Sequence, residues 1–202
     1  MKLWAYTRKP IDNVYYDPRL AFSMHLALET KTGLIPLNHN SGVLFAKGTE
    51  NEDGSINPKT IMYPCLFKAK NGYKIFALRK GGDGEEEPES NEKCIEFTTL
   101  DFVHFKETGF IEIPNNYKKE LQKLKNSNRN NDLKYDLPEG ALFWSSIKIS
   151  EDEATYLAKK LLPPVHAGTE IINYIEASSE EDIKKIKAVK IFSDGSEYES
   201  RV

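Results

Sequence analysis

Aromatic and cationic side chains gather near the N-terminus, and they have the chemistry to bind a sugar. An aromatic ring stacks on the face of a pyranose or furanose ring, while amide, carboxylate or guanidinium groups hydrogen-bond its hydroxyls. The residues that supply such groups here are Trp4, Tyr6, Arg8, Tyr16, Arg19, His39 and Asn40. In the alternative interpretation, Trp4 and Tyr6 are ordinary core residues of a strand, since aromatic side chains bury large areas wherever they occur.

The cysteines and histidines form no recognisable site motif. Cys65 and Cys94 are too few for a disulfide framework, so we expect buried thiols of a reducing compartment. The four histidines are scattered without zinc-like spacing. The sequence also lacks a glycine-rich phosphate loop, a nucleophile elbow and an HExxH motif. We therefore expect no metal and no cofactor.

The composition is typical of a folded, soluble protein. The chain has 202 residues, of which 39 % are hydrophobic and 29 % charged, and its formal net charge is −3. It is too apolar for a disordered chain, and it lacks the basic excess with which an unspecific nucleic-acid binder contacts phosphates. No apolar run approaches the roughly 18 residues that span a bilayer, and the first eight residues lack the apolar stretch of a signal peptide. We expect a cytoplasmic protein that binds neither nucleic acid nor membranes.

Short runs of aromatic and β-branched residues, separated by turn signals, predict strands throughout residues 1–113. The predicted strands are 3–6, 21–28, 43–46, 65–69, 74–78, 94–98 and 110–113. Asn71-Gly72 is the strongest hairpin signal, because a two-residue turn needs positive φ angles. The stretch from Gly81 to Ser90 is acidic and lacks hydrophobic side chains, which predicts a solvated loop.

The pattern changes after Pro114. Tyr117, Leu121 and Leu124 have helical spacing in a Lys-rich stretch, and the polar tract 126–132 that follows is typical of a linker or a long loop.

Two capping boxes and a hairpin signal predict helices and strands in the last third of the chain. Residues 150–153 form a capping box, in which a serine side chain accepts a backbone N–H and a glutamate reaches back, and they predict a helix over 151–162. A second capping box lies at 178–181. Strands at 189–192 and 197–202 flank a Ser-Asp-Gly-Ser turn.

Residues 1–113 resemble the five-bladed β-propellers of glycoside hydrolase family 43. Residues 63–67, Tyr-Pro-Cys-Leu-Phe, followed by Asn71-Gly72 and residues 73–77, are similar to a blade start, where an Asp-Pro opens the innermost strand. Residues 97–105 are similar to the outer-strand signature Ser-x-Asp-Leu-Val-x-Trp, and residues 24–38 resemble an earlier copy. The resemblance covers enough chain for about two blades.

Residues 183–202 resemble the Tyr-Ser-Asp-Gly-Ser hairpin of bacterial immunoglobulin-like domains, which are spacers in long carbohydrate-active proteins. The two resemblances together imply the front portion of a longer family 43-like protein. The expected fold class is mostly β, with partial propeller-like antiparallel sheets plus a small Ig-like β module and one or two short helices. The expected domains are a propeller-like domain at 1–113, a helical and polar linker at 114–136, and an Ig-like module at 137–202 that includes the helix 151–162.

The family 43 resemblance implies hydrolysis with inversion by two carboxylates about 6.5–9.5 Å apart. The base belongs in the Asp-Pro of a blade start, where this chain has Tyr63, whose phenol has a pKa near 10 and cannot activate water at neutral pH. Asp17, before Pro18, is the possible substitute base, or it caps a turn ahead of the proline. The acid would lie on later blades. Asp101 is expected to bind backbone N–H groups in its turn.

The expected function is a carbohydrate-related accessory module of a family 43-like glycosidase that is not catalytic alone, with a plant-type oligosaccharide or polysaccharide as partner. One alternative is an active inverting glycoside hydrolase of the arabinofuranosidase or xylosidase type. Another is a structural protein-interaction module. Open blades expose edge strands, so we also expect self-association or missing C-terminal blades.

Overall fold

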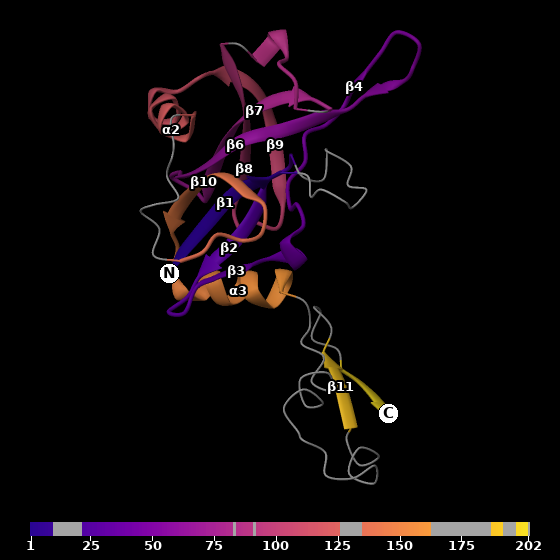
Figure 1. The fold of residues 1–202 in the computed structure, drawn as a ribbon, viewed down its shortest axis with the longest axis vertical. Helices are drawn as coiled ribbons and strands as arrows, with labels where there is room; N and C mark the ends of the chain where they lie inside the picture. The colour runs from indigo at the N-terminus through magenta and orange to yellow at the C-terminus, as the bar shows by residue number, and fades with distance from the viewer. Residues whose placement is uncertain are drawn as a thin grey trace.

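Two four-stranded antiparallel sheets form most of the protein in the computed structural model (Figure 1). The structure describes residues 1–9, 22–82, 84–90, 92–125, 135–162, 187–191 and 197–201. The first sheet has the order β10 (Ala141–Lys148), β1 (Lys2–Arg8), β2 (His25–Glu29) and β3 (Leu34–Pro36). The second has the order β6 (Lys59–Lys68), β7 (Tyr73–Gly81), β8 (Lys93–Thr99) and β9 (Phe105–Glu112). The predicted fold class, mostly β with antiparallel sheets and short helices, is confirmed.

The second sheet is a meander, and its first hairpin is the predicted one. The turn between β6 and β7 closes with Ala69 N donating to Gly72 O at 3.0 Å. Gly72 has a φ of +83°, and a Cβ at this position would collide with the carbonyl oxygen of Thr99. Only glycine satisfies both constraints.

The first sheet joins the two ends of the described main body. β10 pairs with β1 antiparallel, so that Lys2 faces Lys148 and Arg8 faces Ala141. β10 also lies beside β6, where Ser145 Oγ donates to Pro64 O at 2.9 Å. The sequence predicted a separate module from residue 137 onward, whereas residues 141–161 share a core with the first 113. The reason is that β1 pairs with β2 on one edge and with β10, at residues 141–148, on the other.

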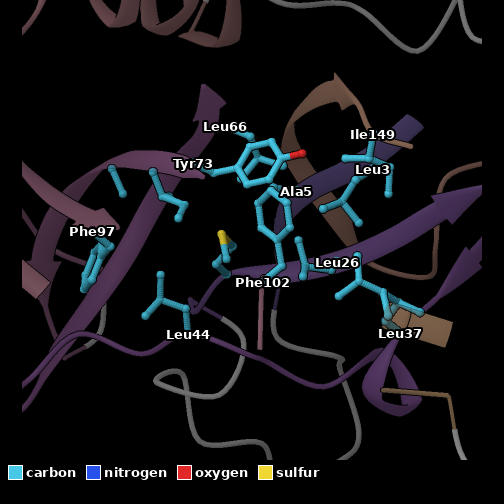
Figure 2. Close-up of a cluster of buried hydrophobic side chains, with 14 of the residues drawn as sticks. Leu3, Ala5, Leu26, Leu37, Leu44, Leu66, Tyr73, Phe97, Phe102 and Ile149 are labelled. Carbon is cyan, nitrogen blue, oxygen red and sulfur yellow. The ribbon is translucent and has the colours of Figure 1, made fainter. Parts of the chain in front are cut away.

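The main core lies between the two sheets and the helix α3 (Glu151–Leu161) (Figure 2). Its fully buried members include Leu3 and Leu26 from the first sheet, Phe97 from the second and Leu157 from α3. The ring centroids of Tyr73 and Phe102 are 4.3 Å apart at the centre of the view in Figure 2. Burying each large apolar side chain contributes roughly 1.5–3 kcal/mol, so this cluster is the main source of stability.

Both helices that the sequence predicted in the main body are confirmed. The helix α2 (Asn115–Lys125) buries Tyr117, Leu121 and Leu124 in a second cluster beside the two cysteines. At the start of α3, Ser150 Oγ accepts from Glu153 N at 3.1 Å, and Glu153 Oε2 accepts from Ser150 N at 2.7 Å. This reciprocal pair is the predicted capping box.

Several shorter elements differ from the sequence prediction or complete it. Residues 43–46 form no strand, only a single bridge between Met24 and Leu44. The 3₁₀ turns η1 (Asn38–Asn40) and η2 (Pro88–Ser90) and the short hairpin of β4 (Thr49–Glu50) and β5 (Ile56–Asn57) were not predicted. The predicted C-terminal hairpin is present as β11 (Lys187–Ile191) paired with β12 (Glu197–Arg201). The linker tract 126–132, the second capping box and the turn 193–196 lie outside the described residues.

The acidic stretch 81–90 is less solvated than predicted. Glu87 is 7 % exposed, because it forms ion pairs with Lys59 and Arg79. No helix in the described ranges is long and apolar enough to cross a bilayer.

Candidate functional site

The aromatic residues of β1 lie in the sheet and not on an exposed platform. Trp4 and Tyr6 are 6 % and 1 % exposed. The indole nitrogen of Trp4 donates to Glu29 Oε2 at 3.0 Å, and its ring centroid lies 4.7 Å from that of Trp144. Buried rings of this kind have no open face on which a sugar ring stacks.

The structure does bring three predicted site residues together, as a polar network around Asn40. Tyr6 Oη donates to Asn40 Oδ1 at 2.7 Å, and Arg8 NH1 donates to Asn40 O at 2.8 Å. His25 Nδ1 lies 3.1 Å from the same carbonyl oxygen. Arg8 Nε and Asn40 Nδ2 both donate to Glu139 O, at 3.0 and 3.3 Å. Burial raises the pKa of Tyr6, against a smaller lowering by Arg8, so the phenol stays protonated as a donor.

This network holds a strained turn. Asn38, His39 and Asn40 have φ angles of 50°, 54° and 58°, a left-handed conformation that costs energy for each non-glycine residue. Asn38 Nδ2 also donates to Gly42 O at 3.0 Å, which fixes the turn from its other end. His39 is exposed at the middle of the turn.

Three other predicted residues lie outside the described part of the chain. They are the possible base Asp17 and the candidate sugar-binding residues Tyr16 and Arg19.

The position that the family resemblance gives to the base is occupied by Tyr63, and Tyr63 is a packing residue here. It lies in a bulge of β6 with a φ of 55°, and its ring centroid is 4.3 Å from that of Phe143. Burial first, and then the charge of Glu86, raise the pKa of Tyr63. The phenol is therefore even less able to remove a proton from water than an ordinary tyrosine.

A second group of polar side chains gathers around Asp101, in the turn between β8 and β9. Asp101 Oδ1 accepts from the backbone N of Val103 at 3.0 Å and of His104 at 2.8 Å, which is the predicted turn-binding role. Asp101 Oδ2 accepts from His104 Nδ1 at 2.7 Å and from Tyr156 Oη at 3.3 Å. Burial favours the neutral acid, but the hydrogen bonds from His104 and Val103 outweigh it and lower the pKa of Asp101 to about 2.

The His104 ring is thereby oriented. Because an ionised carboxylate only accepts, His104 Nδ1 carries the proton and the ring's Nε2 lies on the opposite side. The His104 side chain is 81 % exposed, so Nε2 is available to a ligand. The Asp-x-x-His spacing of residues 101–104 was a local signal for this pair, whereas the contribution of Tyr156 from α3 had none.

Two hollows adjoin this group, and both are lined by Leu100 and Asp101. The larger, of about 580 Å³, also contains Asn71, His104 and Lys106 in its wall. The smaller, of about 280 Å³, is lined in addition by Phe102, Asp152, Glu153 and Tyr156. Leu100 is 74 % exposed. We call the two hollows together the Asp101 site.

Two carboxylates of the Asp101 site, those of Asp101 and Glu153, are acceptors and not acids. Burial opposes ionisation of Glu153, but hydrogen bonds from Tyr73 and Ser150 outweigh it and lower the pKa of Glu153. Asp101 is ionised for the same kind of reason. A glycosidase needs one carboxyl whose pKa is raised, so that it can protonate the leaving oxygen at neutral pH. Asp101 and Glu153 therefore do not supply that proton.

The cysteines are buried thiols, as predicted. Cys65 and Cys94 are at most 1 % exposed. Burial, and then the charge of Glu96, raise the pKa of Cys94 to about 11. Within the described ranges, no group of three or more histidine, cysteine, aspartate or glutamate side chains could hold a metal ion.

Comparisons with protein-family models, with curated proteins and with solved structures found no match. Since one fold hosts many functions, a function for this chain has to follow from the chemistry of its sites.

Proposed function

We propose that this chain is a non-catalytic carbohydrate-binding module, of the accessory kind expected for a family 43-like glycosidase, and that the Asp101 site holds the sugar. The observation that carries the proposal is the combination of an ionised carboxylate and an oriented imidazole beside the exposed Leu100 and the ring of Tyr156. A sugar offers hydroxyls and an apolar C–H face, and this surface offers a partner for each.

The polar partners are suited to hydroxyl groups. Asp101 accepts hydrogen bonds, His104 Nε2 accepts them opposite the protonated Nδ1, and the amide of Asn71 both donates and accepts. Most of the Asp101 hydrogen bonds come from within its own turn, so the carboxylate is already in place before a ligand arrives. A preorganised site loses less entropy on binding.

The lowered pKa values of Asp101 and Glu153 favour the non-catalytic form of the proposal over an active inverting hydrolase. Both groups are ionised at neutral pH, which suits hydroxyl recognition and does not suit proton donation.

The test is calorimetric titration of the chain with neutral arabinose- and xylose-containing oligosaccharides, with Tyr156→Ala as the site variant. Loss of the ring and of its hydrogen bond to Asp101 should weaken binding about tenfold or more. Phe45→Ala is the matched control, because Phe45 is an exposed ring that lines neither hollow of the site. Equal affinities of the two variants would contradict the assignment to the Asp101 site.

Two further measurements separate the alternatives. The enzyme alternative predicts hydrolysis of chromogenic aryl α-L-arabinofuranoside or β-D-xyloside that disappears in Asp17→Asn. The interaction alternative predicts dimers in solution without any response to sugar. Within the described residues, β3 and β9 are each the last strand of a four-stranded sheet, and such pairing would use an edge of this kind.

A further inference from the structure

A further hollow lies away from the Asp101 site. It has a volume of about 870 Å³, within the range of small-molecule sites, and opens between the start of β1, the β2–β3 turn, the end of β10 and the first turns of α3. Figure 1 shows that the N-terminus lies at the start of α3, where these segments meet. We call it the Lys148 pocket.

Lysine side chains dominate the charge of the Lys148 pocket. Lys2, Lys31 and Lys148 line it, against the two carboxylates of Glu29 and Glu151. Lys2 Nζ lies 3.3 Å from Glu29 Oε2. For Lys31 and Lys148, no carboxylate of the described residues lies within ion-pair distance. With the N-terminal ammonium of Met1, which also lines the pocket, four positive groups face two carboxylates, an excess of two positive charges.

Two of these lysines bring like charges together, and one of them, Lys2, has a carboxylate partner in Glu29. Lys2 and Lys148 are directly opposite each other in the β1–β10 ladder. Like charges directly opposite each other destabilise a sheet, and Glu29 offsets part of this cost here.

We propose that the Lys148 pocket binds the carboxylate of a uronic acid unit in a saccharide. This inference rests on the proposed carbohydrate-binding function and names its substrate class. Lys31 and Lys148, which have no carboxylate partner among the described residues, are the cations that such a carboxylate would contact.

The remaining groups of the pocket fit the rest of a sugar. Glu29, Glu151 and the hydroxyls of Thr30 and Thr155 are partners for ring hydroxyls, and Tyr135 adds an aromatic ring.

These groups are held in place before a ligand binds. The Trp4 indole and Lys2 both contact Glu29 Oε2, and Tyr135 Oη donates to Lys31 O at 3.1 Å, which ties the loop before β10 to the β2–β3 turn. Such fixed positions reduce the entropy lost on binding.

The experiment is calorimetric titration with digalacturonic acid, with the neutral galactose disaccharide of the same linkage, and with inorganic phosphate. We expect the acidic disaccharide to bind about tenfold more tightly than the neutral one, since a charge-assisted contact is worth about one factor of ten. Lys148→Gln and Lys31→Gln should each remove most of this preference. Lys118→Gln, on the exposed face of α2, is the matched control and should leave it unchanged.

The outcomes separate this inference from the proposed function. Acidic preference that disappears in Lys148→Gln supports the pocket assignment, with circular dichroism showing that the variant is folded. Binding of neutral sugars without acidic preference overturns the inference and leaves the Asp101 site in place. Acidic preference that survives in both pocket variants, or phosphate that competes at equal affinity, also overturns it. If no saccharide binds, both proposals fail.

Discussion

The carboxylate of Glu87 accepts two hydrogen bonds from the guanidinium of Arg79, from Nε at 2.8 Å and from NH2 at 3.1 Å. Lys59 Nζ lies 2.6 Å from Glu87 Oε1, and all three side chains are less than a tenth exposed. A single glutamate therefore forms ion pairs with two buried cations at the end of the β6–β7 hairpin. Removing one partner from such a group leaves an uncompensated buried charge.

Glu87→Gln keeps the shape of the side chain and removes its charge. We expect the free energy of unfolding, measured by urea denaturation, to fall by about 3 kcal/mol because Arg79 and Lys59 stay buried. The control is Glu120→Gln, which breaks the exposed pair with Lys123 and should cost less than about 1 kcal/mol. Similar losses of unfolding free energy in both variants would show that the buried ion pairs of Glu87 stabilise the protein no more than the exposed pair does.

Asp101 predicts an acid-sensitive component of stability. The pKa of Asp101 is lowered to about 2 in the folded protein, against about 3.9 for an unfolded chain. The folded state therefore gains stability from the ionised form above pH 4, and this gain is lost as the pH falls toward 2. We expect a loss of about 2 kcal/mol over this range that is missing in Asp101→Asn. Urea unfolding at pH 2 to 6 measures it, and parallel profiles for the two proteins would refute the assignment.

Asn40 and Tyr6 should be energetically coupled. Asn40→Ala removes the acceptor of the Tyr6 hydroxyl, and Tyr6 is only 1 % exposed. We expect this change to lower the free energy of unfolding by about 2 kcal/mol. Tyr6→Phe should cost less, and the double variant less than the sum of both, in a thermodynamic cycle from urea denaturation. His39→Ala, in the same turn but exposed, should stay within about 0.5 kcal/mol of the wild type. Strict additivity of Tyr6→Phe and Asn40→Ala would count against the network.

The two thiols should be inert in the folded protein. Cys65 and Cys94 are buried, and the pKa of Cys94 is raised to about 11, so almost no thiolate forms at neutral pH. An aromatic disulfide reagent that releases a coloured thiolate should react with both cysteines in urea and with neither in buffer at pH 7.5. Rapid reaction in buffer would mean that the cluster beside α2 opens readily.

Elements that depend on nearby residues could be predicted from the sequence. The β6–β7 hairpin follows from Asn71-Gly72, and the α3 start follows from the reciprocal bonds of Ser150 and Glu153, which are three residues apart. The turn role of Asp101 is equally local.

Features that depend on distant residues could not be predicted. The burial of Glu87 requires Lys59 and Arg79 from two strands, and an acidic stretch viewed by itself resembles a solvated loop. The Asp101 site is complete only with Tyr156, which comes 55 residues later. The sequence left Trp4 and Tyr6 open between binding and core residues, because the ring that packs on Trp4, that of Trp144 in β10, lies far along the chain.

The pairing of β1 with β10 also determines the order in which the chain can fold during synthesis. At about 5–20 residues per second, β1 and β2 leave the ribosome on the order of ten seconds before β10. For that time the strand formed by residues 2–8 has an open hydrogen-bonding edge, and the core beneath it lacks α3. Newly made chains are therefore most vulnerable to aggregation until the ribosome has passed residue 161, and a stop codon before residue 141 would release a protein with this edge permanently open.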